Sequence, residues 1–241
     1  IKYLDCYILK DLENKNSIAV VSFDNIGSHY KNLKKKFIFK TSFFQQIFFL
    51  TLKTKFLLST TPDLGHTIFQ KSLFKKIQYI YIQHSPFSLS HIYNKKAFIN
   101  FNVIETINKQ QCSDVNKINI LYNKKIQIIK SNYKLFKKKK ENNTLLLKKR
   151  KFLIAPTWHT NFYSNNNLFN IIEILKKLDY DYVFRPHYMS VKKNEISQEY
   201  LDVKNFNLDL NNDIDLNNFT DLISDWSGIF IEFAYYKKKF P

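Results

Sequence analysis

One pattern occurs three times in the second part of this chain: a short apolar run ends in a polar tip. The runs are residues 152–155, 182–184 and 222–223, and their tips are Pro156–His159, Arg185–His187 and Ser224–Gly228. Apolar residues with helical spacing follow the first run, at residues 168–178, and they also follow the third run. Such βα units predict a parallel sheet, in which the carboxyl ends of the strands share one edge. We therefore expect the three polar tips to lie along one edge and to form a binding site.

The third tip has the composition of an anion site. Ser224 and Asp225 end the apolar run, and Ser227 and Gly228 precede a helix. The first N–H groups of a helix lack intrahelical partners, and glycine lets a ligand approach the backbone closely. The serine hydroxyls are expected to donate to phosphate oxygens. The alternative is that Asp225 or Ser227 only caps the helix.

Three further side chains suit a nucleotide diphosphate. Arg185 supplies a permanent charge and His187 a second donor, so a diphosphate is expected between them and the helix after Gly228. Glu232, one turn into that helix, is expected to accept hydrogen bonds from ribose hydroxyls. An exposed helical glutamate without a ligand is the alternative.

The first part of the chain follows the same α/β plan. Strands are expected at residues 17–23, 56–58, 77–82 and 102–107, with helices at residues 41–53 and after residue 110. The run 77–82 leads into His84, which would lie on the rim of the sheet as a candidate for a chemical role. A hydrogen-bonded loop histidine is the alternative, and His66 is the next histidine to consider.

The domain organisation follows from composition. We expect an N-terminal domain over residues 1–122, a basic linker over 123–150 and a C-terminal domain over 151–241. We also expect that the chain is a fragment truncated at both ends. The net charge of +18 is concentrated in residues 1–150, which hold 28 Lys and Arg against 8 Asp and Glu. Such a field attracts nucleic acid, an anionic membrane or a phosphate-rich polymer. Enrichment in Lys, Asn and Ile is also typical of AT-rich coding sequences.

Several classes of protein are disfavoured. With three glycines in the chain, neither a dinucleotide fingerprint nor a Walker loop is present. Asp213 and Asp215 have the spacing of a glycosyltransferase metal pair, but their Asn-rich surroundings favour a solvated turn, and no metal site is predicted. Two cysteines indicate a reducing compartment. No apolar run is long enough to span a bilayer.

Four segments, in this order, resemble the CDP-glycerol glycerophosphotransferase family of teichoic-acid-type polymerases and primases: Tyr79–Pro86, Ala155–Trp158, Arg185–His187 and Ile223–Gly228. The resemblance implies a GT-B architecture, in which two Rossmann-like domains face each other across a cleft, here with the C-terminal domain incomplete. It implies a C-terminal domain that binds the nucleotide and an N-terminal domain that presents the acceptor. It also implies a peripheral enzyme at the cytoplasmic face of a bacterial membrane, without a cofactor.

The resemblance also assigns roles to residues. His84 matches the proposed general base, and Arg185 and His187 match residues that handle the donor's phosphates. The pyrophosphate-contacting turn corresponds to Ser224, Asp225, Ser227 and Gly228. Many relatives carry Tyr, Asp and Gly where this chain has Trp226, Glu232 and Ser85. These departures leave donor and acceptor open, and they favour a branch that makes surface polysaccharide.

The expected reaction is transfer of glycerol phosphate, or a related polyol phosphate, from a CDP-alcohol to a hydroxyl of a polyol-phosphate or lipid-linked acceptor, with release of CMP. One alternative is a GT-B glycosyltransferase that uses a nucleotide-sugar. The other is a basic nucleic-acid-binding module, although the aromatic residues lie mostly in apolar runs and are better interpreted as core.

Overall fold

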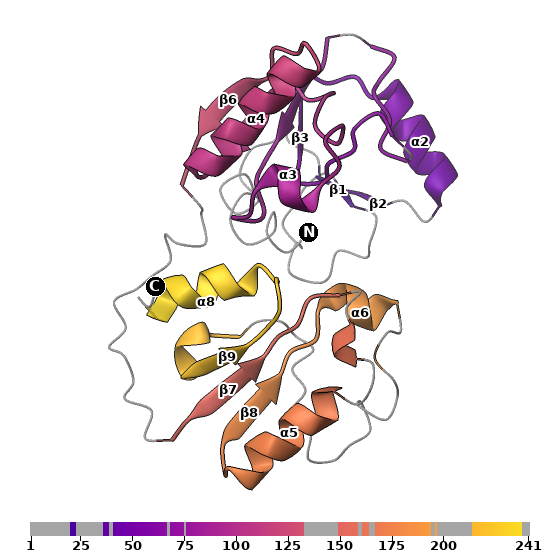
Figure 1. The fold of residues 1–241 in the computed structure, drawn as a ribbon. Helices are drawn as coiled ribbons and strands as arrows, with labels where there is room; N and C mark the ends of the chain where they lie inside the picture. Colours follow the sequence, from indigo (N-terminus) through magenta and orange to yellow (C-terminus); the bar gives the residue numbers. More distant parts are fainter. Residues whose placement is uncertain are drawn as a thin grey trace. The chain divides into compact units, whose positions relative to one another are not determined.

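The computed structural model describes residues 20–22, 36–38, 41–66, 68–74, 76–132, 149–158, 161–163, 167–193, 196 and 214–237. The chain forms two compact units, residues 1–135 and residues 136–241 (Figure 1). His159 and Asp213, which the sequence analysis names, lie outside the described residues.

The first unit contains two parallel sheets. The larger has the order β3-β4-β5-β6, with β3 at Phe56–Ser59, β4 at Gln78–Tyr81, β5 at Val103–Thr106 and β6 at Gln127–Lys130. The smaller pairs β1 (Val20–Ser22) with β2 (Lys36–Ile38). The helices are α2 (Ser42–Thr51), α3 (Leu89–Ile92) and α4 (Lys109–Leu121). Each of the four strands predicted for this part of the chain overlaps one of these strands, and β3 extends one residue past its predicted end.

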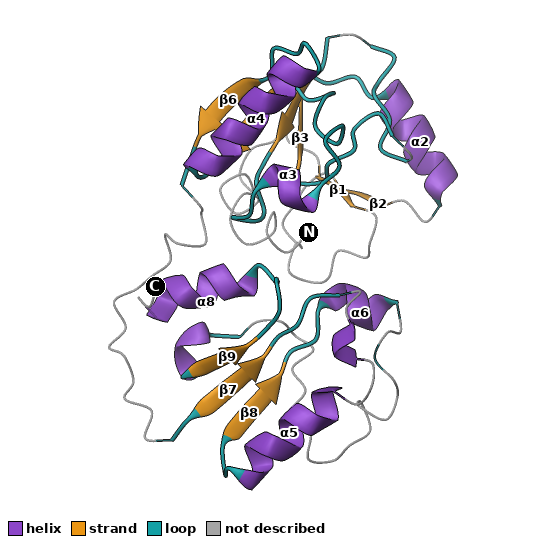
Figure 2. Ribbon diagram, in the orientation of Figure 1, coloured by secondary structure: helices purple, strands orange, loops and turns teal. Residues whose placement is uncertain are grey.

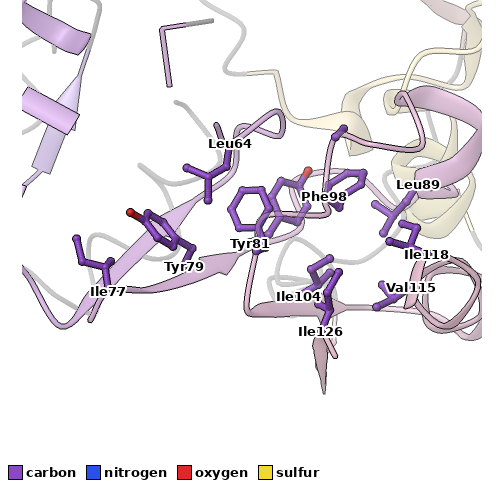
Figure 3. Packing of buried hydrophobic residues seen from close by; sticks show 12 residues of the cluster. Leu64, Ile77, Tyr79, Tyr81, Leu89, Phe98, Ile104, Val115, Ile118 and Ile126 are labelled. Carbon is purple, nitrogen blue, oxygen red and sulfur yellow. The ribbon is translucent and has the colours of Figure 1, made fainter. Parts of the chain in front are cut away.

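The core of the first unit forms on one face of the larger sheet. Alternate residues of β4 point to this face, so that Tyr79 and Tyr81 are buried together with Val115 and Ile118 of α4 (Figure 3). Tyr81 is fully buried, and its ring meets the ring of Phe98 edge-on at 4.9 Å between centroids. This packing fixes the end of β4, from which residue 84 continues.

Strand β6 corrects the predicted linker. Its residues pair with β5 in parallel register from Val103↔Gln127 to Thr106↔Lys130, so residues 127–130 belong to the first sheet rather than to a linker that starts at residue 123. The error has a physical cause: β6 is an edge strand with little buried surface, and lysines surround its isoleucines. Only the alternation of Ile126 and Ile128 indicated a strand.

The second unit is a three-stranded parallel sheet of order β8-β7-β9. Its strands are β7 (Lys151–Ile154), β8 (Asp181–Phe184) and β9 (Asp221–Ile223), and its α-helices are α5 (Asn167–Lys177), α6 (Tyr188–Lys192) and α8 (Ile229–Lys237). The described residues of this unit also form two short 3₁₀ turns, η4 (Asn161–Tyr163) and η5 (Leu216–Asn218). Figure 2 shows α5 beside β8 and α8 beside β9.

The two faces of this sheet carry different helices. Ile154 packs in a cluster with Leu168 and Ile172 of α5, whereas its neighbour Leu153 packs with Ile229 and Phe233 of α8. Because consecutive strand residues point to opposite faces, α5 and α8 cover opposite sides. The α/β class with parallel sheets, predicted from the sequence, is confirmed.

Candidate functional site

The three polar tips of the second unit meet at one edge of its sheet. Ile154, the last residue of the central strand, is in register with Phe184 on one side and with Ile223 on the other, so the strands end level. The chain continues this pairing past the strand ends: Arg185 N donates to Ile154 O at 2.8 Å, and Ala155 N donates to Ile223 O at 2.9 Å. The predicted convergence of the tips is confirmed.

Two hydrogen bonds tie the tip after β9 to the tip after β7. Asp225 Oδ1 accepts a hydrogen bond from Thr157 N at 2.9 Å, and Ser224 Oγ donates to Ala155 O at 2.7 Å. This differs from the role predicted for Ser224, because a hydroxyl has one hydrogen and this one is already donated to the main chain. Asp225, an acceptor only, holds the neighbouring loop in place.

His187 lies at the same edge and begins α6. Its Nδ1 accepts a hydrogen bond from Met189 N at 3.1 Å, so in the neutral ring the hydrogen is carried by Nε2, which is then a donor. The ring stacks on Trp158 with 6.4 Å between centroids, and Lys193 Nζ lies 4.3 Å from the indole centroid. Lys193 adds a cation at this edge that the sequence analysis did not identify.

Helix α8 starts directly after the tip of β9. Phe230 N donates to Ser227 O at 3.0 Å, so the helical bonds start at the tip itself, and the amides of Gly228 and Ile229 lie at the helix N-terminus. Glu232, in the first turn, is half-buried near Tyr236. Burial raises the pKa of the Tyr236 phenol, and the Glu232 carboxylate raises it further. Trp226 is 74% exposed.

In the first unit, His84 follows β4 at the carboxyl edge of the larger sheet, as predicted. Two phenols contact its ring: the Tyr93 hydroxyl lies 3.1 Å from Nε2, and the Tyr81 hydroxyl lies 3.4 Å from Nδ1. Burial lowers the pKa of His84 from 6.5 to about 4, although an interaction with the Thr60 main chain acts in the opposite direction. The ring is therefore neutral at physiological pH and keeps a lone pair that can accept a proton.

Residues 123–239 match the family described as CDP-Glycerol:Poly(glycerophosphate) glycerophosphotransferase. The match covers 117 of the 241 residues, a little under half of the chain. The suspected resemblance is thereby confirmed for the segment that contains all three tips, and it indicates a transferase of the CDP-glycerol glycerophosphotransferase type. A comparison with curated proteins gives no match.

The glycerophosphotransferase segment contains every residue predicted to bind the donor, from Arg185 to Glu232, whereas His84 lies before it. The role of His84 thus depends on its own geometry. Other candidates are less suitable: His66 is exposed in a loop, and Asp215 caps a 3₁₀ turn by accepting from Asn217 N at 3.0 Å. In the described ranges, no group of three or more His, Cys, Asp or Glu side chains is arranged to hold a metal ion.

The loop that follows His84 is fixed by two buried polar residues of α4. Gln111 Nε2 donates to Ser85 O at 3.0 Å and to Phe87 O at 2.8 Å. Asp114 accepts hydrogen bonds from Ser88 Oγ at 2.7 Å and from Leu89 N at 2.9 Å. Burial acts to raise the pKa of Asp114, but the hydrogen bonds from Ser88, Ser90 and Gln110 outweigh it and lower the pKa. These contacts hold the segment between His84 and Tyr93.

Sequence reasoning missed this arrangement. Gln111 and Asp114 are polar residues in a helix, a pattern that usually indicates a solvated face, and Tyr93 follows His84 by nine residues through α3. Among the described residues, no helix is long and apolar enough to cross a membrane.

Proposed function

We propose that the chain transfers glycerol phosphate, or a related polyol phosphate, from a CDP-alcohol to a hydroxyl of a membrane-linked or polysaccharide acceptor, with release of CMP. The proposal includes the GT-B arrangement that the family resemblance implies. One observation carries it: within the matched family segment, three strands end level and bring Arg185, His187 and the N-terminus of α8 to one edge.

The donor side of the reaction is assigned to the second unit. A diphosphate carries negative charge, and this edge offers the Arg185 guanidinium, the Nε2 hydrogen of His187 and the first amides of α8. These groups would stabilise the charge that develops on the departing CMP. Asp225 and Ser224 act on the protein itself, since both hydrogen-bond the loop after β7.

The acceptor side is assigned to the first unit. His84, neutral at physiological pH, would accept the proton of the acceptor hydroxyl as its oxygen attacks the β-phosphorus of the CDP-alcohol. Its low pKa makes it a weak base. Phosphoryl transfer passes through a loose transition state in most analyses, so positioning and neutralisation of charge supply most of the catalysis and a weak base suffices.

Donor binding provides the first test. Both tryptophans of the chain, Trp158 and Trp226, lie at the proposed donor edge, so CDP-glycerol should change the intrinsic fluorescence. Titration with CDP-glycerol, CDP-ribitol and UDP-glucose gives the donor class. Arg185→Ala should weaken binding of the CDP-alcohol by roughly 10- to 100-fold, and Arg185→Lys by less. Tighter binding of UDP-glucose than of either CDP-alcohol would favour the nucleotide-sugar alternative.

Turnover provides the second test. CMP release from CDP-glycerol in the presence of an oligo(glycerol phosphate) acceptor should fall by roughly 10²–10⁴-fold in His84→Ala, with donor affinity nearly intact. His187→Ala should weaken both donor binding and turnover. A folded His84→Ala chain that turns over at the wild-type rate would remove the assignment of the base, and His66 would be mutated next.

The first unit is further proposed to associate with the cytoplasmic face of an anionic membrane. Residues 1–150 carry a net charge of +20, and Lys53 and Lys55 are exposed after α2. Phe43 and Phe44 of α2 are also exposed, at 64% and 61%. Basic residues near an anionic surface contribute roughly 1 kcal/mol each, and exposed aromatic rings enter the interface. The same field explains the nucleic-acid alternative, which predicts binding to random RNA.

A further inference from the structure

The contacts that the ring of His84 already makes limit how it can accept a proton from the substrate in the proposed reaction. A neutral imidazole has one N–H group and one lone pair, and both ring nitrogens of His84 face tyrosine hydroxyls. Nε2, the nitrogen with the shorter contact, is 3.1 Å from the Tyr93 hydroxyl. An acceptor alcohol that delivers its proton directly to Nε2 would have to displace Tyr93.

The two tyrosines differ in their access to the surface. Tyr81 is fully buried in the core of the first unit, where its ring packs against Phe98 (Figure 3). Its ring also meets the ring of Phe101. Tyr93 is only half-buried. The two hydroxyls also interact with each other. Of the two phenols that contact His84, Tyr93 is therefore the one that a substrate can reach.

Tyr93 is held firmly in this position. Its N–H donates to Leu89 O at 3.1 Å at the end of α3, and its ring meets Phe98 edge-on at 5.4 Å between centroids. Asp114 fixes the start of the same helix through Ser88 and Leu89. The hydroxyl of Tyr93 is thus directed at His84 by packing and hydrogen bonds on both sides of α3.

We propose that Tyr93 is a further catalytic residue, whose hydroxyl receives the proton of the acceptor alcohol while it passes its own proton to His84 Nε2. The inference rests on the proposed function. The acceptor oxygen forms its bond to the β-phosphorus as the bond between that phosphorus and the bridging oxygen breaks. CMP leaves with that electron pair, and His84 ends as the imidazolium.

The relay returns to its starting state without another reagent. The imidazolium gives its proton to water after the products leave, because burial disfavours the charged ring. Burial raises the pKa of Tyr93, and the Asp63 carboxylate raises it further, although the hydrogen bond from Tyr81 acts in the opposite direction. Because the net effect is a raised pKa, the phenol does not ionise during the transfer. The two proton transfers are therefore concerted.

The test compares two Tyr→Phe variants of the full chain. Tyr93→Phe removes the relay hydroxyl and keeps the ring, so kcat for CMP release should fall by roughly 10²-fold while the Kd of the donor is unchanged. Tyr79→Phe is the matched control: it removes a buried hydroxyl of β4 that accepts from Ser72 N at 2.8 Å, and kcat should be unchanged. A wild-type kcat in Tyr93→Phe, with His84→Ala inactive, overturns the relay and leaves the proposed function intact.

A second measurement distinguishes the relay from a structural role of the ring. The rate in mixtures of H₂O and D₂O should depend quadratically on the deuterium fraction in wild type, because two protons move, and linearly in Tyr93→Phe. In ¹⁵N-histidine-labelled protein, Tyr93→Phe should also shift the Nε2 resonance of His84. An Nε2 resonance that does not shift overturns the contact itself. A wild-type chain that binds CDP-glycerol but transfers nothing from it overturns both proposals.

Discussion

The burial of His84 should make the stability of the first unit depend on pH in a calculable way. Its pKa is about 4 in the folded protein, against 6.5 for an exposed histidine. Between these two values the unfolded chain binds a proton that the folded chain does not, so stability is lost as the pH falls below 6.5. Each pKa unit corresponds to about 1.36 kcal/mol, which gives about 2.5 kcal/mol between pH 7.5 and pH 4.5.

The substitution His84→Gln isolates this effect, because glutamine keeps a polar side chain that does not titrate. Hydrogen exchange of the β4 amides, at Gln78–Tyr81, reports the first unit at each pH after correction for intrinsic rates. The β8 amides, at Asp181–Phe184, serve as the control in the other unit. Between pH 7.5 and pH 4.5, we expect the β4 amides of wild type to lose about 2.5 kcal/mol more stability than those of His84→Gln. For the β8 amides we expect the two proteins to lose the same amount. Equal losses in β4 would show that His84 ionises like an exposed residue and refute the burial argument.

Four further predictions follow from single contacts. Asp225→Ala, which removes the acceptor of the Thr157 N–H group, should weaken binding of CDP-glycerol by roughly 10-fold in calorimetry, and Asp225→Asn should weaken it less. Asp114→Asn, which turns an NH₂ group toward N–H and O–H donors, should destabilise the first unit by roughly 1–3 kcal/mol in urea. Gly65→Ala should lower the Tm, because Gly65 has a φ of 87° and a Cβ there would lie 2.7 Å from Asn100 Nδ2. Co-sedimentation of the chain with anionic vesicles should decrease as the salt concentration rises, and it should also decrease in Phe43→Ser. Equal binding of the chain to neutral and anionic vesicles would contradict the membrane proposal.

The strands that carry the site could be predicted because a buried parallel strand reads as a short apolar run. Phe152–Ala155 and Tyr182–Phe184 have this form, and the polar residues after them mark where each strand ends. Strand order was not needed, since all carboxyl ends of a parallel sheet lie at one edge. Edge strand β6 shows the limit of the method, because a strand with few buried side chains has no apolar run.

The contacts within each site could not be predicted, because they depend on where a side chain points. Three positions show this: the Ser224 hydroxyl donates to Ala155 O, Gln111 reaches two carbonyls of the His84 loop, and Tyr93 reaches Nε2 of His84. In each case the residue type permits several partners. Only the packing of a second element, absent from any local pattern, selects one of them.

For Asp225, the role that the family resemblance assigns must be reconciled with the contact that the structure shows. As a carboxylate it would repel the phosphates of a donor, yet it lies in the turn that the family resemblance assigns to pyrophosphate. Its hydrogen bond from Thr157 N offers an explanation, because one carboxylate oxygen, Oδ1, is directed at the main chain of the loop after β7. That bond fixes the Thr157–Trp158 segment, where the ring of His187 stacks on Trp158. Gly228 lies three residues after Asp225, and α8 starts at the next residue. We therefore propose that Asp225 orders the proposed donor edge through the main chain of Thr157 and makes no contact with the phosphates.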